Sequence, residues 1–238
     1  MTVELENKST VLLRDVKVGD KVQVEHGKFE PIYGFGHSDQ TLSGHYLQLR
    51  LSNGRQLEIS GDHMVFVQES NSVPASMVRV GDELVSSDDG EVKIESIQQV
   101  TSKGAFAPFT YSGTIIINGI KASTYISLQP GTEFLIIGEF QTPFSLQWLA
   151  HSFLLPFRLL GSDTILSVWM DWLQETSQWL LTQHPIVVSA VMVPLVAVFG
   201  TATAGEALWL HPGWALAVGL VAYFAFHIQQ TSTKAKIA

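Results

Sequence analysis

The side chain with the clearest capacity for chemistry is His63, which ends the segment Ser60-Gly61-Asp62-His63. An imidazole titrates near neutral pH and can relay a proton, and a serine hydroxyl three residues away can orient it. The same segment directly precedes the apolar run MVFV. His63 could equally be a structural histidine at the start of a strand, with Ser60 and Asp62 shaping the turn before it. Spacing alone leaves both interpretations open.

The chain has no cysteine, which excludes disulfides, cysteine metal sites and thiol nucleophiles within these 238 residues. His37, His45 and His63 lack the short spacing of metal ligands, so we predict neither a metal nor a cofactor. His37 lies in YGFGHSD, among glycines and polar residues that are typical of an exposed loop. An ordinary surface histidine is therefore an alternative to a functional one at this position.

Charge and hydropathy divide the chain into two parts. Residues 1–139 contain 18 acidic and 11 basic side chains, whereas residues 140–238 contain 4 and 3. All six tryptophans lie in the second part, a composition typical of segments that meet lipid. The net charge of −8 and the scattered basic residues leave no basic stripe for phosphates. We therefore do not expect nucleic acid as a partner.

Short runs rich in Val, Ile, Leu and Thr, separated by turn residues, predict an all-β structure over residues 11–128. Asn53-Gly54 lies between two alternating runs and predicts a hairpin with a type I′ turn, which needs positive φ at both central positions. The segment VKVGDKV at 16–22 recurs 62 residues later as VRVGDEL at 78–84. This repeat predicts two related β units about a pseudo-two-fold axis, unless VGD is merely a common turn.

With these features together, the chain resembles the Hint superfamily, the self-processing domains of inteins and of the Hedgehog C-terminal (Hog) region, and it is most similar to the Hog type. The resembling segments run in order along residues 4–128: STVLLRD, the first VGD unit, LEISGDHMVFV, VPASMVRVGDELV and GAFAPFTYSGTIIINGIKASTYISL. Further on, LAHSFLLPFRLL at 149–160 is similar to the start of the Hog lipid-recognition extension. The resemblance implies an all-β Hint fold for residues 1–139.

The resemblance also implies a reaction. In that family an N-terminal cysteine attacks the preceding carbonyl, and an acceptor such as a sterol hydroxyl or water then cleaves the resulting thioester. The family's Thr-x-x-His motif corresponds here to Ser60 and His63. By this resemblance His63 is the general acid near the scissile nitrogen, and Ser60 is the hydroxyl that positions it.

Three positions depart from the family pattern. His37 stands where Hog proteins have an acceptor-activating Asp, and it could still act as a base toward a hydroxyl or water. Thr124 stands where they have the cysteine of an AS-Cys-Tyr motif. Counting back from Thr10-Val11, the nucleophile position falls on Glu4, which cannot form a thioester. We therefore expect no self-cleavage by the thioester route from the sequence as it stands.

The rest of the chain predicts contact with a membrane. Residues 140–183 have Trp and Phe at helical spacing, which predicts either interfacial amphipathic helices or a helical cap buried on the β domain. In residues 184–238, the uncharged stretches 186–204 and 208–228 predict one or two transmembrane helices before a short basic tail. We expect an integral membrane protein and leave open the side on which the β domain lies.

These observations predict a membrane-tethered Hint/Hog-type autoprocessing domain. Its chemistry would be an intramolecular N-to-S acyl shift that transfers an upstream segment of a longer precursor to a hydroxyl or water. The implied partners are that segment, the membrane and a lipid or sterol-like acceptor. The alternative function is a catalytically silent Hint fold that serves as a membrane-anchored binding or scaffold module, which the absence of cysteine favours.

Overall fold

The protein was studied as a computed structural model, which describes two compact units, Met1–Gln183 and His184–Ala238. The described residues are 1–160 except 69, 70, 128, 130 and 138, and then isolated positions between 164 and 205 (164–166, 168, 170, 172, 175, 179, 182, 183, 187, 190, 198, 201, 204 and 205). The strands and helices discussed below all belong to the first unit.

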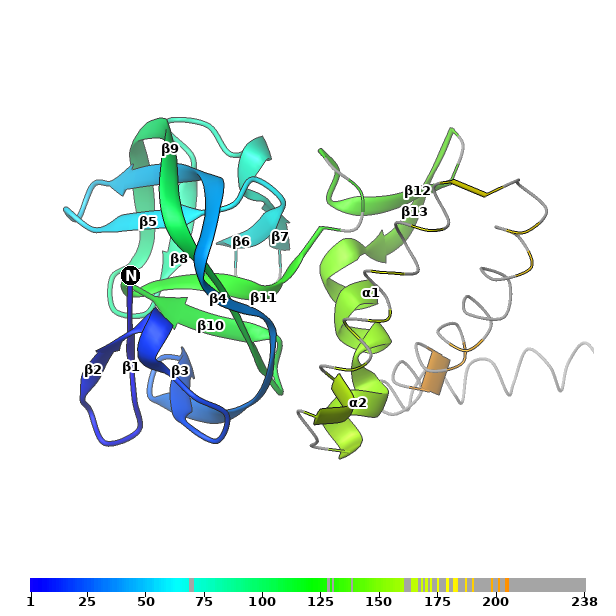
Figure 1. Cartoon of the computed structure of the whole chain (residues 1–238). Helices are drawn as coiled ribbons and strands as arrows, with labels where there is room; N and C mark the ends of the chain where they lie inside the picture. Colours follow the sequence, from blue (N-terminus) through cyan, green and yellow to red (C-terminus); the bar gives the residue numbers. More distant parts are fainter. Residues whose placement is uncertain are drawn as a thin grey trace, which may run out of the picture. The chain divides into compact units, whose positions relative to one another are not determined.

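The first unit is predominantly β, which confirms the alternating sequence pattern (Figure 1). Its strands within the described residues are β1 Thr2–Glu4, β2 Thr10–Leu12, β3 Lys21–Glu25, β4 Lys28–Leu51, β5 Gln56–Ile59, β6 His63–Gln68, β7 Asn71–Pro74, β8 Glu83–Ser86, β9 Gly90–Thr110, β10 Thr114–Ile117, β11 Ile120–Ile126, β12 Phe134–Ile137 and β13 Phe140–Ser145. The helices with described bounds are the 3-10 turns η1 Leu13–Asp15 and η2 Ala75–Met77, followed by α1 Leu146–Phe153 and α2 Leu155–Leu160, and isolated described residues between 164 and 179 are also helical.

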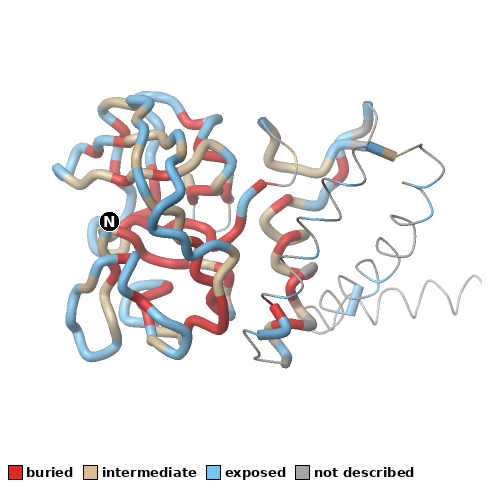
Figure 2. The backbone as a smooth tube through the Cα atoms, viewed as in Figure 1, coloured by how far each residue is buried: buried red, intermediate tan, exposed pale blue. Residues whose placement is uncertain are grey.

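Two long strands, β4 and β9, run antiparallel from Ile32 opposite Thr110 to Leu51 opposite Ile94. In the main sheet the order is β3-β4-β9-β8-β11-β6-β7, with β5 paired to β4 and β10 paired to β11. Figure 1 shows the long pair as a twisted ribbon that crosses the β unit, and Figure 2 shows that its middle is exposed while the β10 and β11 region is buried. The ribbon therefore joins shorter strands at both of its ends.

The 62-residue repeat is present in the backbone. The amide of Lys17 donates to the Asp20 carboxylate at 2.9 Å, and the amide of Arg79 donates to the Asp82 carboxylate at 2.8 Å. The pairing of β1 with β2 also recurs, since Thr2 opposite Leu12 becomes Met64 opposite Pro74 in β6 and β7. Strands β4 and β9 begin at Lys28 and Gly90, again 62 residues apart. Two related β units thus follow the offset that the sequence predicted.

The predicted hairpin at Asn53-Gly54 forms, because β4 and β5 pair antiparallel from Leu47 opposite Ile59 to Arg50 opposite Gln56. The predicted type I′ turn was wrong, since Gly54 has φ +78° but Asn53 is not among the residues with positive φ. The connection between β4 and β5 is longer than two residues, and the Asn53 side chain makes one hydrogen bond within it and one to a residue outside it. It accepts from the Arg55 amide at 3.1 Å and donates to Asp89 at 2.9 Å.

The segment after residue 139 starts as a strand, not as a helix. Strands β12 and β13 form a hairpin, and α1 begins at Leu146 because the Ser145 hydroxyl caps it by accepting from the Trp148 amide at 3.2 Å. One face of the helices is buried with aromatic side chains of the β strands, in a cluster made of Tyr33, Met64, Phe109, Tyr125, Leu146, Ala150, Leu154, Phe157 and Leu166. Residues 146–157 therefore pack as the buried cap, one of the two interpretations left open by the sequence.

The predicted transmembrane stretches 186–204 and 208–228 fall almost entirely outside the described residues. In the part of the chain that is described, no helix combines the length and the apolar character needed to cross a membrane. The membrane anchor and the side of the membrane stay predictions from the sequence.

Candidate functional site

The turn between β5 and β6 brings Ser60 and His63 together. The Ser60 Oγ atom lies 2.9 Å from His63 Nδ1, and the His63 amide donates to the Ser60 carbonyl at 3.1 Å. The turn is held from outside by amides that donate to its carbonyls, Ser76 to Gly61 at 2.9 Å and Ser127 to Asp62 at 2.6 Å. The backbone therefore fixes the geometry of the serine and histidine side chains that the sequence singled out.

His63 is half-buried and forms part of the wall of a cavity. Burial, with a smaller contribution from the charge of His37, lowers the pKa of His63 from 6.5 to about 4. The imidazole is therefore neutral at pH 7. When the Ser60 hydroxyl donates to Nδ1, the proton of the neutral ring lies on Nε2, which can then donate a hydrogen bond into the cavity.

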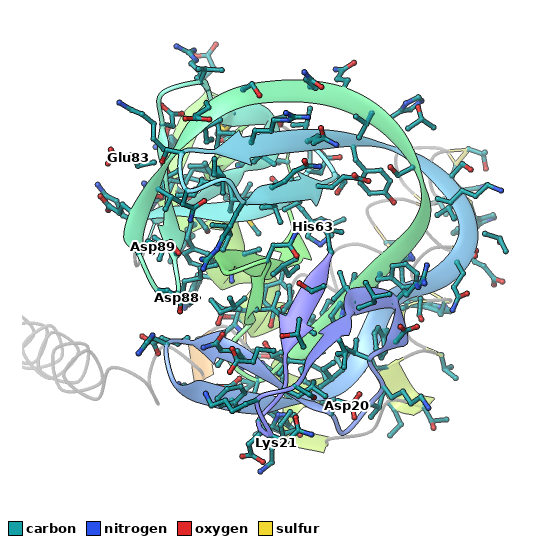
Figure 3. All side chains as sticks on the ribbon, turned by 90° about the vertical axis from the view of Figure 1, so that its left-hand side faces the viewer. Asp20, Lys21, His63, Glu83, Asp88 and Asp89 are labelled. Carbon is teal, nitrogen blue, oxygen red and sulfur yellow. The ribbon has the colours of Figure 1, made fainter. Side chains whose placement is uncertain are left out.

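A cavity of about 280 Å³ collects most of the predicted site residues. Ser60 and His63 reach it from the β5–β6 turn, His37 from β4, and Thr124 from β11. Figure 3 shows His63 in the interior of the β unit, beside the end of the β1–β2 hairpin, whereas the labelled acidic residues lie at its periphery. Four side chains from three parts of the sequence therefore share one chamber.

Glu4 does not share this chamber. It pairs with Thr10 in the β1–β2 hairpin, lies 3.0 Å from Lys8 Nζ, and lines a separate surface hollow of about 430 Å³. The N-terminal residue that lines the chamber with His63 is Met1, whose carbonyl accepts from the Leu13 amide at 3.0 Å. Sequence reasoning missed Met1, although the 62-residue repeat contains the signal, since residue 1 is the equivalent of residue 63.

A second cavity of about 180 Å³ adjoins the first and is lined mainly by apolar groups. The two cavities share five wall residues, which are His37, His63, Ala107, Thr124 and Ile126. The remaining wall comes from both the strands and the helical segment, and consists of Gly36, Phe109, Tyr125, Ala150, Leu154 and Met170. The polar groups of the site therefore border a small apolar space.

Thr124 has an unusual environment for a hydroxyl. The residue is 2% exposed, and its Oγ1 atom is buried with no hydrogen-bond partner in the described part of the chain. Its amide is satisfied by the Gly113 carbonyl at 3.0 Å. A buried hydroxyl without a partner lowers stability, and such groups concentrate at functional sites. The Thr124 hydroxyl is thus available to a molecule in either cavity.

The described residues contain no group of three or more His, Asp or Glu side chains arranged to hold a metal ion. His45, the third histidine considered from the sequence, lies beside Thr101, with its Nδ1 atom 3.4 Å from the threonine Oγ1. It does not line the chamber of His37 and His63.

Comparison with known proteins points to one family. The family model described as the Hint module matches residues 1–132. Warthog protein 6 of Caenorhabditis elegans is 26% identical over 141 residues, 54% of this chain and 24% of that protein. Protein hedgehog of Drosophila hydei is 28% identical over 182 residues, 71% of this chain and 34% of that protein. The chain thus spans between about a quarter and a third of these relatives.

Among solved structures, a DnaB intein from Synechocystis sp. PCC 6803 aligns with a TM-score of 0.46 at 12% identity, covering 52% of this chain and 94% of the intein. The gp41-1 intein aligns with a TM-score of 0.44 at 14% identity, covering 51% of this chain and 93% of the intein.

We predict different stability effects for two buried threonines. Thr124→Val removes an unpartnered hydroxyl, so the free energy of unfolding should stay the same or rise by up to about 1 kcal/mol. Thr110→Val is the matched control, since Thr110 is also buried but donates to the Thr114 carbonyl at 2.7 Å, and its loss should cost about 1 to 3 kcal/mol. Denaturant unfolding measures both. Equal losses would show that the Thr124 hydroxyl is hydrogen-bonded in solution.

We also predict a pH dependence caused by His63. Its pKa is lower in the folded state than the ordinary 6.5, so the unfolded chain binds the proton first as the pH falls. The free energy of unfolding is therefore at its full value above pH 6.5 and decreases as the pH falls toward 4. The decrease caused by His63 is about 2 kcal/mol between pH 7 and pH 5. Denaturant unfolding of the wild type and of His63→Gln at both pH values isolates the contribution of His63 to this decrease. If both proteins lose the same stability, the pKa of His63 is not lowered.

Proposed function

The chain belongs to the Hint family, and we propose that it is a Hog-type autoprocessing domain whose chamber around His63 promotes an intramolecular acyl shift. The hydrogen-bonded pair Ser60 and His63, in one chamber with Met1, is the observation that supports this proposal most directly. A chain segment preceding Met1 would continue from this chamber, so that its peptide bond to the Met1 nitrogen would lie near the imidazole.

The proposed acyl shift needs few groups. A thiol at the position of Met1 attacks the preceding carbonyl carbon, so that a C–S bond forms and the C–N bond breaks. The neutral His63 imidazole accepts the proton of the thiol, and the imidazolium so formed gives a proton to the departing nitrogen. The low pKa of His63 suits this role, because the ring is neutral at pH 7 and can accept the thiol proton, and the imidazolium formed from it is a stronger acid than one of ordinary pKa.

The second step transfers the acyl group. An acceptor hydroxyl or water attacks the thioester carbon, the C–S bond breaks, and His37 takes the proton of the acceptor. Thr124 Oγ1 is free to donate to the oxygen that becomes negatively charged. This sequence has 238 residues and no cysteine, so within it the first step lacks its nucleophile. We therefore expect self-cleavage only when a thiol is supplied at the chamber.

The proposal predicts where a cysteine restores cleavage. In the full chain with a reporter protein fused before Met1, Met1→Cys should release the reporter when a thiol or hydroxylamine is added, because Met1 lines the chamber. Glu4→Cys is the matched control and should not, because Glu4 faces the separate surface hollow. Intact mass spectrometry of both fusions gives the result. His63→Ala in the Met1→Cys fusion should reduce the rate at least about a hundredfold.

The result also separates the two functions. Release from Met1→Cys alone supports an acyl-shift site that lacks only its nucleophile. Release from Glu4→Cys alone would contradict the placement of the scissile bond at Met1. Absence of release from both folded fusions would contradict the autoprocessing proposal and favour the alternative, a catalytically silent Hint fold that acts as a binding or scaffold module.

The second cavity bears on the acceptor. Its apolar walls beside His37 support an apolar acceptor, as the lipid-like partner expected from the sequence would be. Its volume of about 180 Å³ is close to that of the roughly 150 Å³ cavities that bind one benzene molecule. The cavity therefore suits a compact apolar group, and a larger lipid would have to extend outside it.

This argument predicts a preference among acceptors. With the Met1→Cys fusion, benzyl mercaptan should cleave the thioester about tenfold faster than a hydrophilic thiol, 2-mercaptoethanesulfonate, after correction for their thiol pKa values. Ala150→Leu should remove this preference, because the larger side chain fills the cavity. A preference that survives Ala150→Leu would show that the apolar acceptor binds elsewhere.

A further inference from the structure

Helix α1 follows residues 1–132, the part of the chain matched by the family model, yet it contacts the strand that carries Thr124. We propose that α1 is a support of the site in which Gln147 and His151 are positioning residues that hold Ser123–Tyr125, so that the Thr124 hydroxyl faces the chamber. The effect of this support on the reaction rests on the function proposed above. The positioning itself can be measured separately.

Strand pairing alone leaves this part of β11 weakly defined. Ala122 lies opposite Val65 of β6 and Ile126 lies opposite His63, so four steps along β11 correspond to two steps along β6. The pairing with β10 also ends at Ser123, opposite Thr114. The three residues 123–125 therefore form an irregularity in which the ladder does not dictate the direction of each side chain. Another element has to set the direction of Thr124.

Gln147 supplies contacts on both sides of Thr124. Its Oε1 atom accepts from the Ser123 hydroxyl at 2.5 Å, and its Nε2 atom donates to the Gly113 carbonyl at 3.2 Å. The same Gly113 carbonyl accepts from the Thr124 amide, and the same Ser123 hydroxyl accepts from the Tyr125 amide at 2.8 Å. One amide side chain thus ties together the two groups that hold the backbone around Thr124.

His151 extends this contact by one helical turn. Residues 147 and 151 are four apart and lie on the same face of α1. The His151 Nδ1 atom lies 3.0 Å from the Tyr125 hydroxyl. Gly113 has φ +72°, and a Cβ atom there would lie 2.5 Å from the Tyr125 ring and 2.9 Å from His151 Nδ1. The close approach of Gly113, Tyr125 and His151 allows the helix to hold both residues that flank Thr124.

The packing of α1 indicates that the helix is fixed against the β strands and does not merely cover them. Leu146, Ala150 and Leu154 are buried on the same side of the helix, in contact with the aromatic cluster that includes Tyr125 and Phe109. Ala150 and Leu154 also form part of the wall of the small apolar cavity. The helix therefore contributes to the site in two ways, since it builds the cavity wall and fixes the strand opposite that wall.

The test compares Gln147→Ala with Gln129→Ala in the full chain fused to a reporter and carrying Met1→Cys. Alanine keeps the helix, because it has the highest helix propensity. Gln129 is a matched control, since its side chain also makes two hydrogen bonds, both with the backbone of Ile136 at 2.8 Å and neither with Ser123 or Gly113. Hydrogen exchange of the 120–126 segment, followed by mass spectrometry, reports on β11, and reporter release reports on the reaction.

We expect Gln147→Ala to speed exchange in 120–126 by about fivefold to tenfold, and to slow reporter release by about tenfold to a hundredfold. Gln129→Ala should change neither quantity. Gln147→Glu keeps the acceptor for Ser123 but loses the donor to Gly113, so it should restore part of both losses. A purely structural role would lower stability without this graded rescue of the rate.

Each outcome either supports or contradicts the proposed positioning role of α1. Unchanged exchange in 120–126 with Gln147→Ala would overturn the proposal, whether or not the fusion is cleaved. Faster exchange with an unchanged release rate would overturn the link between α1 and the reaction. Faster exchange in a fusion that does not release its reporter even with Gln147 intact supports the positioning and contradicts only the autoprocessing function. Faster exchange together with slower release supports both.

Discussion

The antiparallel pairing of β4 with β9 is the constraint on which the rest of the β unit depends. Strand β4 belongs to the first copy of the 62-residue repeat and β9 to the second. Because they are antiparallel, the start of each strand lies opposite the end of the other, and their backbone hydrogen bonds fix the two copies against each other. Of the residues that line the chamber, His37 lies on β4 and Ala107 on β9, whereas Ser60 and His63 lie at the turn after β5. The chamber exists because the ribbon brings these segments to one place.

The chemistry of the site follows from enclosing polar groups in a mainly apolar space. The cost of burial lowers the pKa of His63 and leaves it neutral, and the same burial leaves the Thr124 hydroxyl without a partner in the described part of the chain. The unpartnered hydroxyl reduces stability at any pH, whereas the lowered pKa of His63 reduces it only as the pH falls below 6.5. They also leave an imidazole and a hydroxyl ready to bind a polar group that enters the chamber.

The sequence predicted what depends on local patterns. Alternation predicted the strands, the VGD repeat predicted the duplicated turns, and the spacing of Ser60 and His63 corresponds to a real hydrogen bond. Register over longer distances was harder to predict. Counting from Thr10 put Glu4 at the nucleophile position, but the β1–β2 pairing turns Glu4 toward another hollow and leaves Met1 in the chamber. The contact of Gln147 with Ser123 could not be predicted, because it depends on how α1 packs against β11.

The repeat has a consequence for how such a site can arise. Residues 1 and 63 occupy equivalent positions in the two halves, and both line the same chamber. In a symmetric pair of identical halves, these positions would hold the same residue and face each other across the axis. Here one copy supplies Met1 and the other supplies an imidazole. Different residues at equivalent positions of two copies of one structural unit are enough to make an asymmetric site within a nearly symmetric scaffold.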